Sequence, residues 1–230
     1  MNYPKHVALI PDGNRTWAKE KWFIPFVWHL EWFNRAIEIT QHIFSNTPIE
    51  VFTIWGLSTE NLKNRSDKEL EYLFEIYKKI PQELFEFLKE NKINFKVAWD
   101  KDKLPQHLID FLNTKEKELE TLSWKTLVLA INYGWQDELL RWIQKLCDNK
   151  EKATKENLEK YLDFWWLPPV ELVIRTKQKF AKRLSWFMLW WIGYAQLYFT
   201  DLYCPDFTIE EFNKAIEWYS STLKTQNYGK

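Results

Sequence analysis

The sequence predicts a single α/β domain over residues 1–230, with a mainly parallel sheet of about six strands flanked by helices. Short apolar segments rich in β-branched residues alternate with longer segments in which apolar residues recur every three or four positions. Polar motifs directly follow several of the apolar segments, where ligands bind in a parallel sheet. No repeat or low-complexity tract divides the chain, so we expect one domain.

The predicted strands are short and apolar. The first, HVALI, ends in a Pro-Asp-Gly turn, and the second, EVFTIWGLS, is rich in β-branched residues. Strands are expected at residues 6–10, 50–58, 94–99, 126–134, 170–176 and 196–201.

The predicted helices have apolar residues on one face. Ser66 precedes one of them with Glu69 three residues later, a pattern typical of a capping box, and Thr208 caps the last helix in the same way. Pro81 should divide or kink the helix in which it lies. Helices are expected near Thr16 and at residues 33–44, 66–91, 104–120, 136–149, 154–162 and 208–221.

Composition and charge exclude several classes of protein. Lys+Arg and Asp+Glu are both 32, and this neutrality argues against a nucleic-acid partner bound by phosphate neutralisation. Cys147 and Cys204 lie far apart, which argues against a disulfide framework or zinc site and favours reduced cytosolic thiols. The longest apolar run, residues 186–199, is too short to cross a membrane, and no signal peptide is visible. We therefore expect a cytoplasmic protein.

Three polar motifs are candidates for an anion site. DGNR (residues 12–15) follows the first predicted strand, STEN (residues 58–61) follows the second, and Arg175, Arg183 and Ser185 lie at or after the fifth, around the basic run KQKFAKR. Backbone N–H groups at a helix start and arginine side chains both suit phosphate. Taken singly, each motif has a structural alternative: a β-turn with a capping aspartate, a capped loop and a solvated basic loop.

Signatures of other functions are absent from the sequence. It contains no GxxxxGK[ST] or GxGxxG nucleotide motif, no HExxH metal motif and no GxSxG nucleophile motif. His29 taken alone is more often a structural than a functional residue.

The motifs DGN..WAK, STEN, NYG, IRT and RLS.F.LW...YA.LYFTD together resemble the cis-prenyltransferases, in the family's order and approximate spacing. The resemblance spans nearly the whole chain. It implies the cis-prenyltransferase fold and an enzyme that condenses isopentenyl diphosphate onto an allylic diphosphate such as farnesyl diphosphate. The product would be a cis-polyprenyl diphosphate, a precursor of a cell-wall carrier lipid. A long apolar tunnel should hold the hydrocarbon, with Gly56 and the aromatic residues of 70–87 as candidate walls.

The resemblance also implies roles for individual residues. Asp12 is expected at the reacting diphosphate and Mg²⁺, and Asn61 as proton acceptor. The residues expected to bind the two substrates are Gly13, Asn14, Arg15, Thr16, Trp17, His29, Ser58, Thr59, Glu60, Leu62, Arg65, Arg175, Arg183, Leu184 and Ser185.

The chain departs from the family at several positions. Gln196 stands where the family has a glutamate that binds magnesium, so a second metal ligand besides Asp12 would be neutral. Thr16 replaces a frequent arginine, Pro25 a frequent basic residue, and Leu62 a frequent aromatic residue.

Tryptophan is unusually common and glycine unusually rare, with 15 and 5 residues. By the resemblance, eight tryptophans stand where the family has glycine: Trp22, Trp28, Trp32, Trp99, Trp124, Trp135, Trp166 and Trp186. The simplest hypothesis is a genetic code in which UGA encodes glycine but is read as tryptophan; the alternative is a lineage with an aromatic-rich core. The mass of the native protein distinguishes them.

Two other functions remain open at this level: a non-catalytic subunit of a heteromeric prenyltransferase, and a polyprenyl-phosphate binding protein. The resemblance further implies a homodimer. The protein would touch the inner face of the membrane transiently to release its product.

Overall fold

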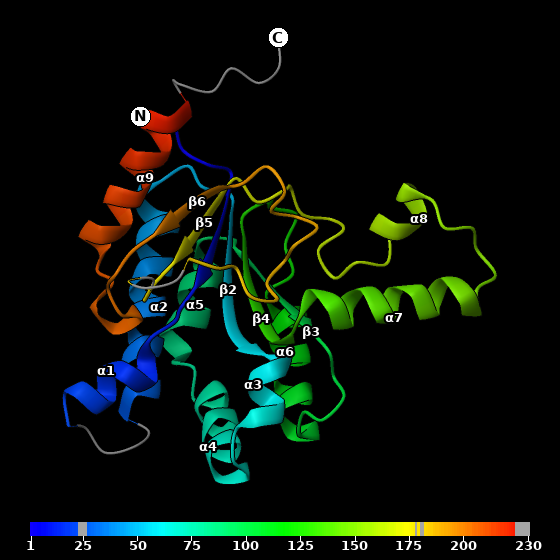
Figure 1. The fold of residues 1–230 in the computed structure, drawn as a ribbon, viewed down its shortest axis with the longest axis horizontal. Helices are drawn as coiled ribbons and strands as arrows, with labels where there is room; N and C mark the ends of the chain where they lie inside the picture. The colour runs from blue at the N-terminus through cyan, green and yellow to red at the C-terminus, as the bar shows by residue number, and fades with distance from the viewer. Residues whose placement is uncertain (23–26, 178, 180–181, 224–230) are drawn as a thin grey trace.

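The structure is a computed structural model that describes residues 1–22, 27–177, 179 and 182–223 (Figure 1). Its six strands form one parallel sheet in the order β3-β4-β2-β1-β5-β6. The strands are β1 (His6–Ile10), β2 (Val51–Ser58), β3 (Asn94–Trp99), β4 (Thr126–Tyr133), β5 (Leu172–Arg175) and β6 (Gln196–Phe199). The fold class and the six predicted strands are confirmed.

Nine α-helices and one short 3₁₀ helix lie within the described residues. They are α1 (Asn14–Glu20), α2 (Val27–Asn46), α3 (Thr59–Asn64), α4 (Asp67–Lys78), α5 (Gln82–Glu90), α6 (Gln106–Glu118), α7 (Trp135–Asp148), α8 (Lys155–Glu159), η1 (Cys204–Asp206) and α9 (Ile209–Leu223).

The helix predictions from the sequence agree with the structure at most positions. Pro81 divides the predicted long helix into α4 and α5, because proline cannot donate the backbone hydrogen bond that a continuous helix needs. The Ser66 side chain accepts the N–H of Glu69, as the capping box predicts. The STEN segment, where no helix was expected, begins α3, because Ser58 Oγ accepts the N–H of Asn61 and caps a short helix.

Alternate residues of the strands pack into two separate cores, one on each face of the sheet. On one face, Leu9, Ile54 and Ile174 pack with buried residues of α2, α4, α5, α6 and α9. On the other face, Ala8, Ala130 and Val173 pack with residues 158–192. Because both faces are covered, the strands are apolar almost throughout, as expected for a parallel sheet.

Helix α7 is less enclosed than the others. It begins at the end of β4 and extends away from the sheet, together with α8 (Figure 1). Only Glu138 and Leu146 of α7 are buried, whereas Leu140 and Ile143 are 65% and 46% exposed.

Gly56 in β2 is needed because Tyr77 of α4 packs directly on it. A methyl group at Gly56 would overlap Tyr77 Oη and lie 3.0 Å from Leu129 Cδ1. Tyr77 is fully buried, and its Oη has no hydrogen-bond partner among the described residues. A buried hydroxyl without a partner destabilises a fold by about 1–3 kcal/mol.

We therefore expect Tyr77→Phe to raise the free energy of unfolding by about 1 kcal/mol. Gly56→Ala should lower it by about 1–3 kcal/mol through overpacking, and by less in the Tyr77→Phe background. Urea denaturation of the four proteins in this double-mutant cycle measures both effects. If Gly56→Ala lowered the free energy of unfolding equally in the parent and in Tyr77→Phe, the proposed contact between Gly56 and the Tyr77 hydroxyl would be contradicted.

Candidate active site

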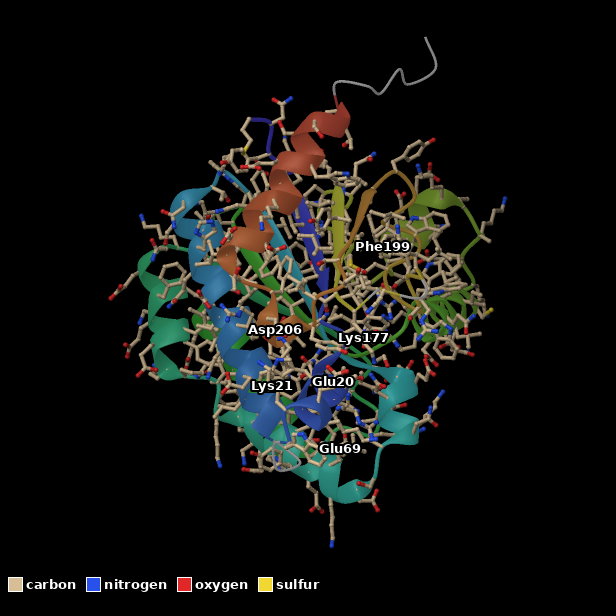
Figure 2. The ribbon with its side chains drawn as sticks, turned by 60° about the vertical axis from the view of Figure 1, so that its left-hand side comes forward. Glu20, Lys21, Glu69, Lys177, Phe199 and Asp206 are labelled. Atoms are coloured by element: carbon tan, nitrogen blue, oxygen red, sulfur yellow. The ribbon has the colours of Figure 1, made fainter. Side chains whose placement is uncertain are left out.

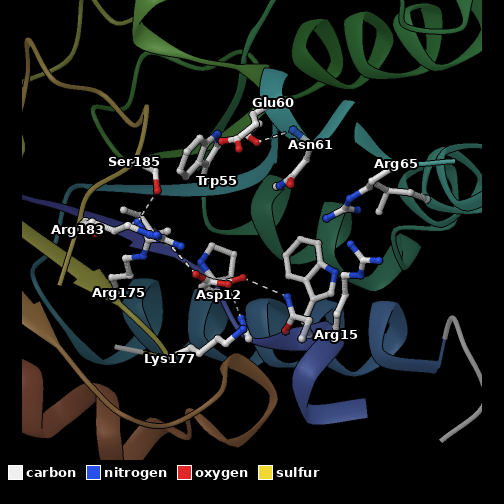
Figure 3. A pocket seen from close by; sticks show the side chains of 18 residues that line it. Asp12, Arg15, Trp55, Glu60, Asn61, Arg65, Arg175, Lys177, Arg183 and Ser185 are labelled. Carbon is white, nitrogen blue, oxygen red and sulfur yellow. Dashed lines mark hydrogen bonds and ion pairs between the residues drawn. The ribbon is translucent and has the colours of Figure 1, made fainter. Parts of the chain in front are cut away.

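A polar pocket of about 280 Å³ lies at the carboxyl ends of β1, β2 and β5 (Figure 3). Asp12 and Arg15 follow β1, Glu60 and Asn61 follow β2, and Arg175 ends β5. The full lining is Ile10, Pro11, Asp12, Gly13, Asn14, Arg15, Trp32, Trp55, Gly56, Ser58, Glu60, Asn61, Arg65, Leu73, Arg175, Lys177, Arg183 and Ser185. The three motifs predicted from the sequence thus meet in one pocket.

The turn at Asp12 and Gly13 forms the floor of the pocket. Gly13 has a φ of 100°, in the left-handed region, and a methyl group there would lie 2.5 Å from Tyr203 Cδ1. Only glycine fits both requirements. The N–H of Asp12 donates to Thr176 Oγ1 at 2.8 Å, and the N–H of Gly13 donates to Asp12 Oδ1 at 2.7 Å. These bonds fix the turn and hold the Asp12 carboxylate at the pocket.

Arg175 connects the first and third motifs. Its guanidinium donates to the backbone oxygen of Arg183 at 2.8 Å, to Ser185 Oγ at 2.9 Å and to Asp12 Oδ2 at 2.9 Å (Figure 3). Arg175 is only 4% exposed, so its charge is held by the ion pair with Asp12 rather than by solvent. Its Nε is buried and has no hydrogen-bond partner among the described residues.

Helix α3 carries two polar side chains into the pocket. Glu60 and Asn61 are exposed and line it, next to the capping residue Ser58. Thr59 and Leu62 are buried and do not line it. Thr59 instead donates to Asp137 Oδ2 of α7 at 2.7 Å, which fixes the first turn of α3. These two residues, predicted to bind substrate, lie in the supporting structure, because successive residues of a helix face different directions.

Cations outnumber carboxylates in the pocket. The lining contains Arg15, Arg65, Arg175, Arg183 and Lys177, against the acidic residues Asp12 and Glu60. Arg65 lies 3.5 Å from Glu69 Oε1, and burial lowers the pKa of its guanidinium. In a chain of zero net charge this local excess creates a positive potential that attracts anions.

Lys177 is a pocket residue that the sequence indicated only as part of a basic run. Its φ is 57°, and its ammonium donates to Thr16 Oγ1 at 2.7 Å. This hydrogen bond ties Lys177 to α1; Figure 2 labels Lys177 and, on that helix, Glu20. Residues 178, 180 and 181 of the same run lie outside the described residues.

Other predicted substrate residues have different positions. Trp17 is buried and donates from Nε1 to Asp206 Oδ1 at 2.9 Å, so it fastens α1 to η1 rather than lining the pocket. Thr16 does not line the pocket, but its hydroxyl accepts a hydrogen bond from Lys177, which does. Leu184 packs against the core on the α7 side of the sheet. His29 belongs to α2 by its backbone, but its side chain lies outside the described part of the structure.

Gln196 does not meet Asp12 within the chain. It pairs with Leu172, which pairs with Val7, so it lies at the amino ends of the strands. It lines a separate hollow formed by residues such as Tyr3, Lys5 and Glu50. Gln196 is thus level with Val7 in the sheet. Ile10 lies three residues, or about 10 Å, further along β1, and Asp12 lies beyond Ile10. The prediction of a metal site shared by Asp12 and Gln196 is therefore wrong for a single chain. The sequence placed Gln196 at the start of a predicted strand and Asp12 after another, but the strand pairing that separates them is seen only in the structure.

A small apolar cavity of about 40 Å³ lies between the sheet and the helices α2 and α5. It is lined by Trp32, Phe33, Ala36, Ile37, Thr40, Ile54, Ile80, Leu84, Phe95, Leu127, Val128 and Leu129. It lies between the sheet and the helices, as expected of the tunnel, but neither Gly56 nor any aromatic residue of 70–87 lines it. Its volume is also too small for a tunnel, since it holds only a few water molecules. Trp32, Trp55 and Leu73 also contribute to the polar pocket and were not predicted as site residues, because nothing local distinguishes them from core residues.

The chain is similar to known proteins over nearly its whole length. Residues 10–228 match the model of a family described as putative undecaprenyl diphosphate synthase. The isoprenyl transferase of Treponema denticola is 36% identical over 98% of this chain and 97% of its own, and that of Aquifex aeolicus is 33% identical over 96% and 94%.

Two solved structures have the same fold and are each 28% identical in sequence to this chain. Lavandulyl diphosphate synthase from Lavandula x intermedia, in complex with dimethylallyl diphosphate, has a TM-score of 0.82 over 94% of this chain and 95% of its own. A probable undecaprenyl diphosphate synthase from Campylobacter jejuni has a TM-score of 0.74 over 96% of each chain.

The charge of the pocket predicts that it binds inorganic diphosphate. We expect Arg15→Gln and Arg183→Gln each to weaken that binding about tenfold or more, because each removes an exposed cation from the lining. Arg35→Gln is the matched control, since Arg35 lies outside the lining. Titration calorimetry at fixed ionic strength measures the affinities. If the two pocket variants bound diphosphate as tightly as the control, the pocket would not be the anion site.

Proposed function

Because this chain belongs to the undecaprenyl diphosphate synthase family, we propose that it elongates an allylic diphosphate with isopentenyl diphosphate units, forming cis double bonds. The observation that carries this proposal is the pocket itself. Five cationic side chains surround Asp12 at the sheet edge, and an apolar cavity lies beside them. Such a site suits a substrate with an anionic head and a hydrocarbon tail.

The reaction breaks the bond between C1 of the allylic chain and its diphosphate oxygen. The departing diphosphate takes the electron pair, and negative charge builds up on its oxygens. Fixed cations near those oxygens lower the barrier, because they stabilise charge that develops in the transition state. We assign this role to Arg15, Lys177 and Arg183, with Arg175 holding the Asp12 carboxylate in place.

The new bond forms between C1 of the allylic chain and C4 of isopentenyl diphosphate. A proton then leaves C2 of the isopentenyl unit, which restores a double bond. We assign its acceptance to the exposed amide of Asn61, from which it passes to the released diphosphate. A neutral amide oxygen suffices, because a hydrogen next to a carbocation is strongly acidic.

We further propose that the reaction requires Mg²⁺. Magnesium usually binds one or two carboxylates together with substrate phosphates. Asp12 could supply such a carboxylate, because its side chain is about one third exposed at the pocket. The described residues contain no group of three or more acidic, histidine or cysteine side chains that could hold the ion without substrate. When bound with diphosphate, the ion would neutralise charge on the leaving group.

The function is tested with farnesyl diphosphate, labelled isopentenyl diphosphate and Mg²⁺, with products separated by chain length. Chain growth is the expected result. Tight binding of both substrates without growth would indicate a polyprenyl-phosphate binding protein. Growth that appears only after a second prenyltransferase chain is added would indicate a non-catalytic subunit.

Asp12→Asn should reduce turnover about 100-fold or more, and the protein should still fold, with a lower melting temperature because Arg175 loses its charged partner. Asparagine keeps the shape of the side chain and can still accept a hydrogen bond from Arg175, whereas alanine would leave that buried guanidinium without its partner. Steady-state kinetics together with a thermal melt measure both properties. Turnover near the parent value would remove Asp12 from the mechanism.

Gln196→Glu should leave the magnesium dependence of the rate unchanged. Position 196 lies at the amino end of β6, away from Asp12 and the pocket. Initial rates over a magnesium titration compare the two proteins. A lower half-saturating magnesium concentration in the variant would show that this side chain reaches the ion, for example from a partner chain.

We also propose a homodimer, formed through the exposed face of α7. Leu140 and Ile143 lie one turn apart on that face, where apolar groups gain about 25 cal/mol per Å² when a partner covers them. The double substitution Leu140→Asp and Ile143→Asp should shift the mass measured by sedimentation to that of a monomer. An unchanged mass would place the interface elsewhere.

Contact with a membrane would be transient. None of the helices in the described residues is long and apolar enough to cross a bilayer. A long polyprenyl product is nevertheless almost entirely hydrocarbon, so we propose that it leaves the protein into a lipid surface.

A further inference from the structure

Trp32 lies between the polar pocket and the apolar cavity. It lines both of them and is only 3% exposed. It belongs to an early turn of α2, at the end of that helix nearest the pocket. Its ring centroid is 4.9 Å from that of Phe33, which also lines the cavity. The indole is therefore a wall that the two spaces share.

The residues beyond Trp32 on α2 are smaller. Ala36 and Thr40 follow at intervals of four, so they lie on the same face of the helix and line the cavity. Ala36 adds only a methyl group, and Thr40 turns its hydroxyl back to the Ala36 carbonyl at 2.6 Å. Along this face, Trp32 is the large side chain nearest the pocket.

Aromatic packing continues from Trp32 toward β2. The Phe33 ring contacts Tyr77 edge-on at 5.6 Å between centroids, and Tyr77 packs against Gly56, which lines the pocket. Trp32, Phe33 and Tyr77 thus form a continuous set of rings, the aromatic partition. The indole is held by this packing and cannot be displaced without disturbing buried neighbours.

We propose that the indole of Trp32 limits the length of the product; with glycine encoded at position 32, this limit would be absent. This inference rests on the proposed function, in which the diphosphate stays in the pocket and the hydrocarbon lengthens by five carbons at each step. A growing chain gains about 0.8 kcal/mol for each buried CH₂, so it extends into apolar space where such space is accessible. The aromatic partition closes that route, and the chain stops growing when it has filled the space on the pocket side of Trp32.

The first test compares product lengths of the parent, Trp32→Ala and Trp32→Leu, with farnesyl and dimethylallyl diphosphate as primers. The expected products of Trp32→Ala are longer than those of the parent by at least one isoprene unit, and those of Trp32→Leu are no longer than those of Trp32→Ala. Trp124→Ala is the matched control, because Trp124 is 72% exposed and lines neither space. Its products should match those of the parent. Identical product lengths in the parent and both Trp32 variants would overturn the inference while leaving the proposed function intact.

The second test leaves Trp32 in place. Ala36→Leu narrows the cavity one helical turn beyond the partition. If Trp32 is the limit, the chain never reaches position 36, and Ala36→Leu should not change product length in the parent protein. Shorter products would show that the hydrocarbon passes Trp32, and would overturn the inference even if the Trp32 variants failed to fold.

The third test separates this inference from catalysis. Calorimetry measures the affinity for non-hydrolysable thiodiphosphates with chains of about ten and about twenty carbons, where each buried CH₂ is worth about 0.8 kcal/mol. We expect the longer ligand to bind Trp32→Ala at least tenfold more tightly than it binds the parent, with the shorter ligand little changed. Equal affinities of the two proteins for the longer ligand would contradict the proposed role of the aromatic partition. If the ligands bind as expected but no turnover is measured, the role of the aromatic partition is supported and the proposed enzymatic function is contradicted.

Discussion

The site depends on the ion pair between Arg175 and Asp12. Arg175 ends β5 and Asp12 follows β1, so the pair joins two neighbouring strands at their carboxyl ends. The same guanidinium also holds Ser185 and the backbone of Arg183. A buried charge needs a partner, and here that requirement fixes three segments that are distant in the sequence. The pocket is therefore organised before any substrate enters it.

Charge in this protein is local rather than global. Positive and negative side chains balance over the whole chain, yet five cations face two carboxylates in the pocket. Zero net charge weakens long-range attraction to nucleic acid, whereas the local excess of cations makes the potential in the pocket positive. Apolar side chains line a separate cavity between the sheet and α2, so the charged and the apolar surfaces of the site are kept apart.

The eight tryptophans that we expect at glycine positions of the family have different structural consequences. Among the described residues, only Trp22 of the eight has a left-handed backbone, with a φ of 57°, where glycine is favoured. Trp124 is exposed and costs little there. Trp32 is buried between the two spaces of the site, so its replacement by glycine would alter the site itself. Whether residue 32 is tryptophan or glycine therefore affects the function as well as the fold.

The sequence by itself determined the α/β class, the six strands, the division at Pro81 and the three motifs of the site, because periodicity, caps and turns are local properties. It also carried the resemblance to the family that the comparisons then showed. Tertiary structure decided which motif residues face the pocket: Thr59, Leu62 and Trp17 turn into supporting contacts, whereas Lys177 and Trp32 line the site. It likewise placed Gln196 at the opposite end of the sheet from Asp12. Strand order and side-chain direction depend on contacts between distant segments, and no local pattern encodes them.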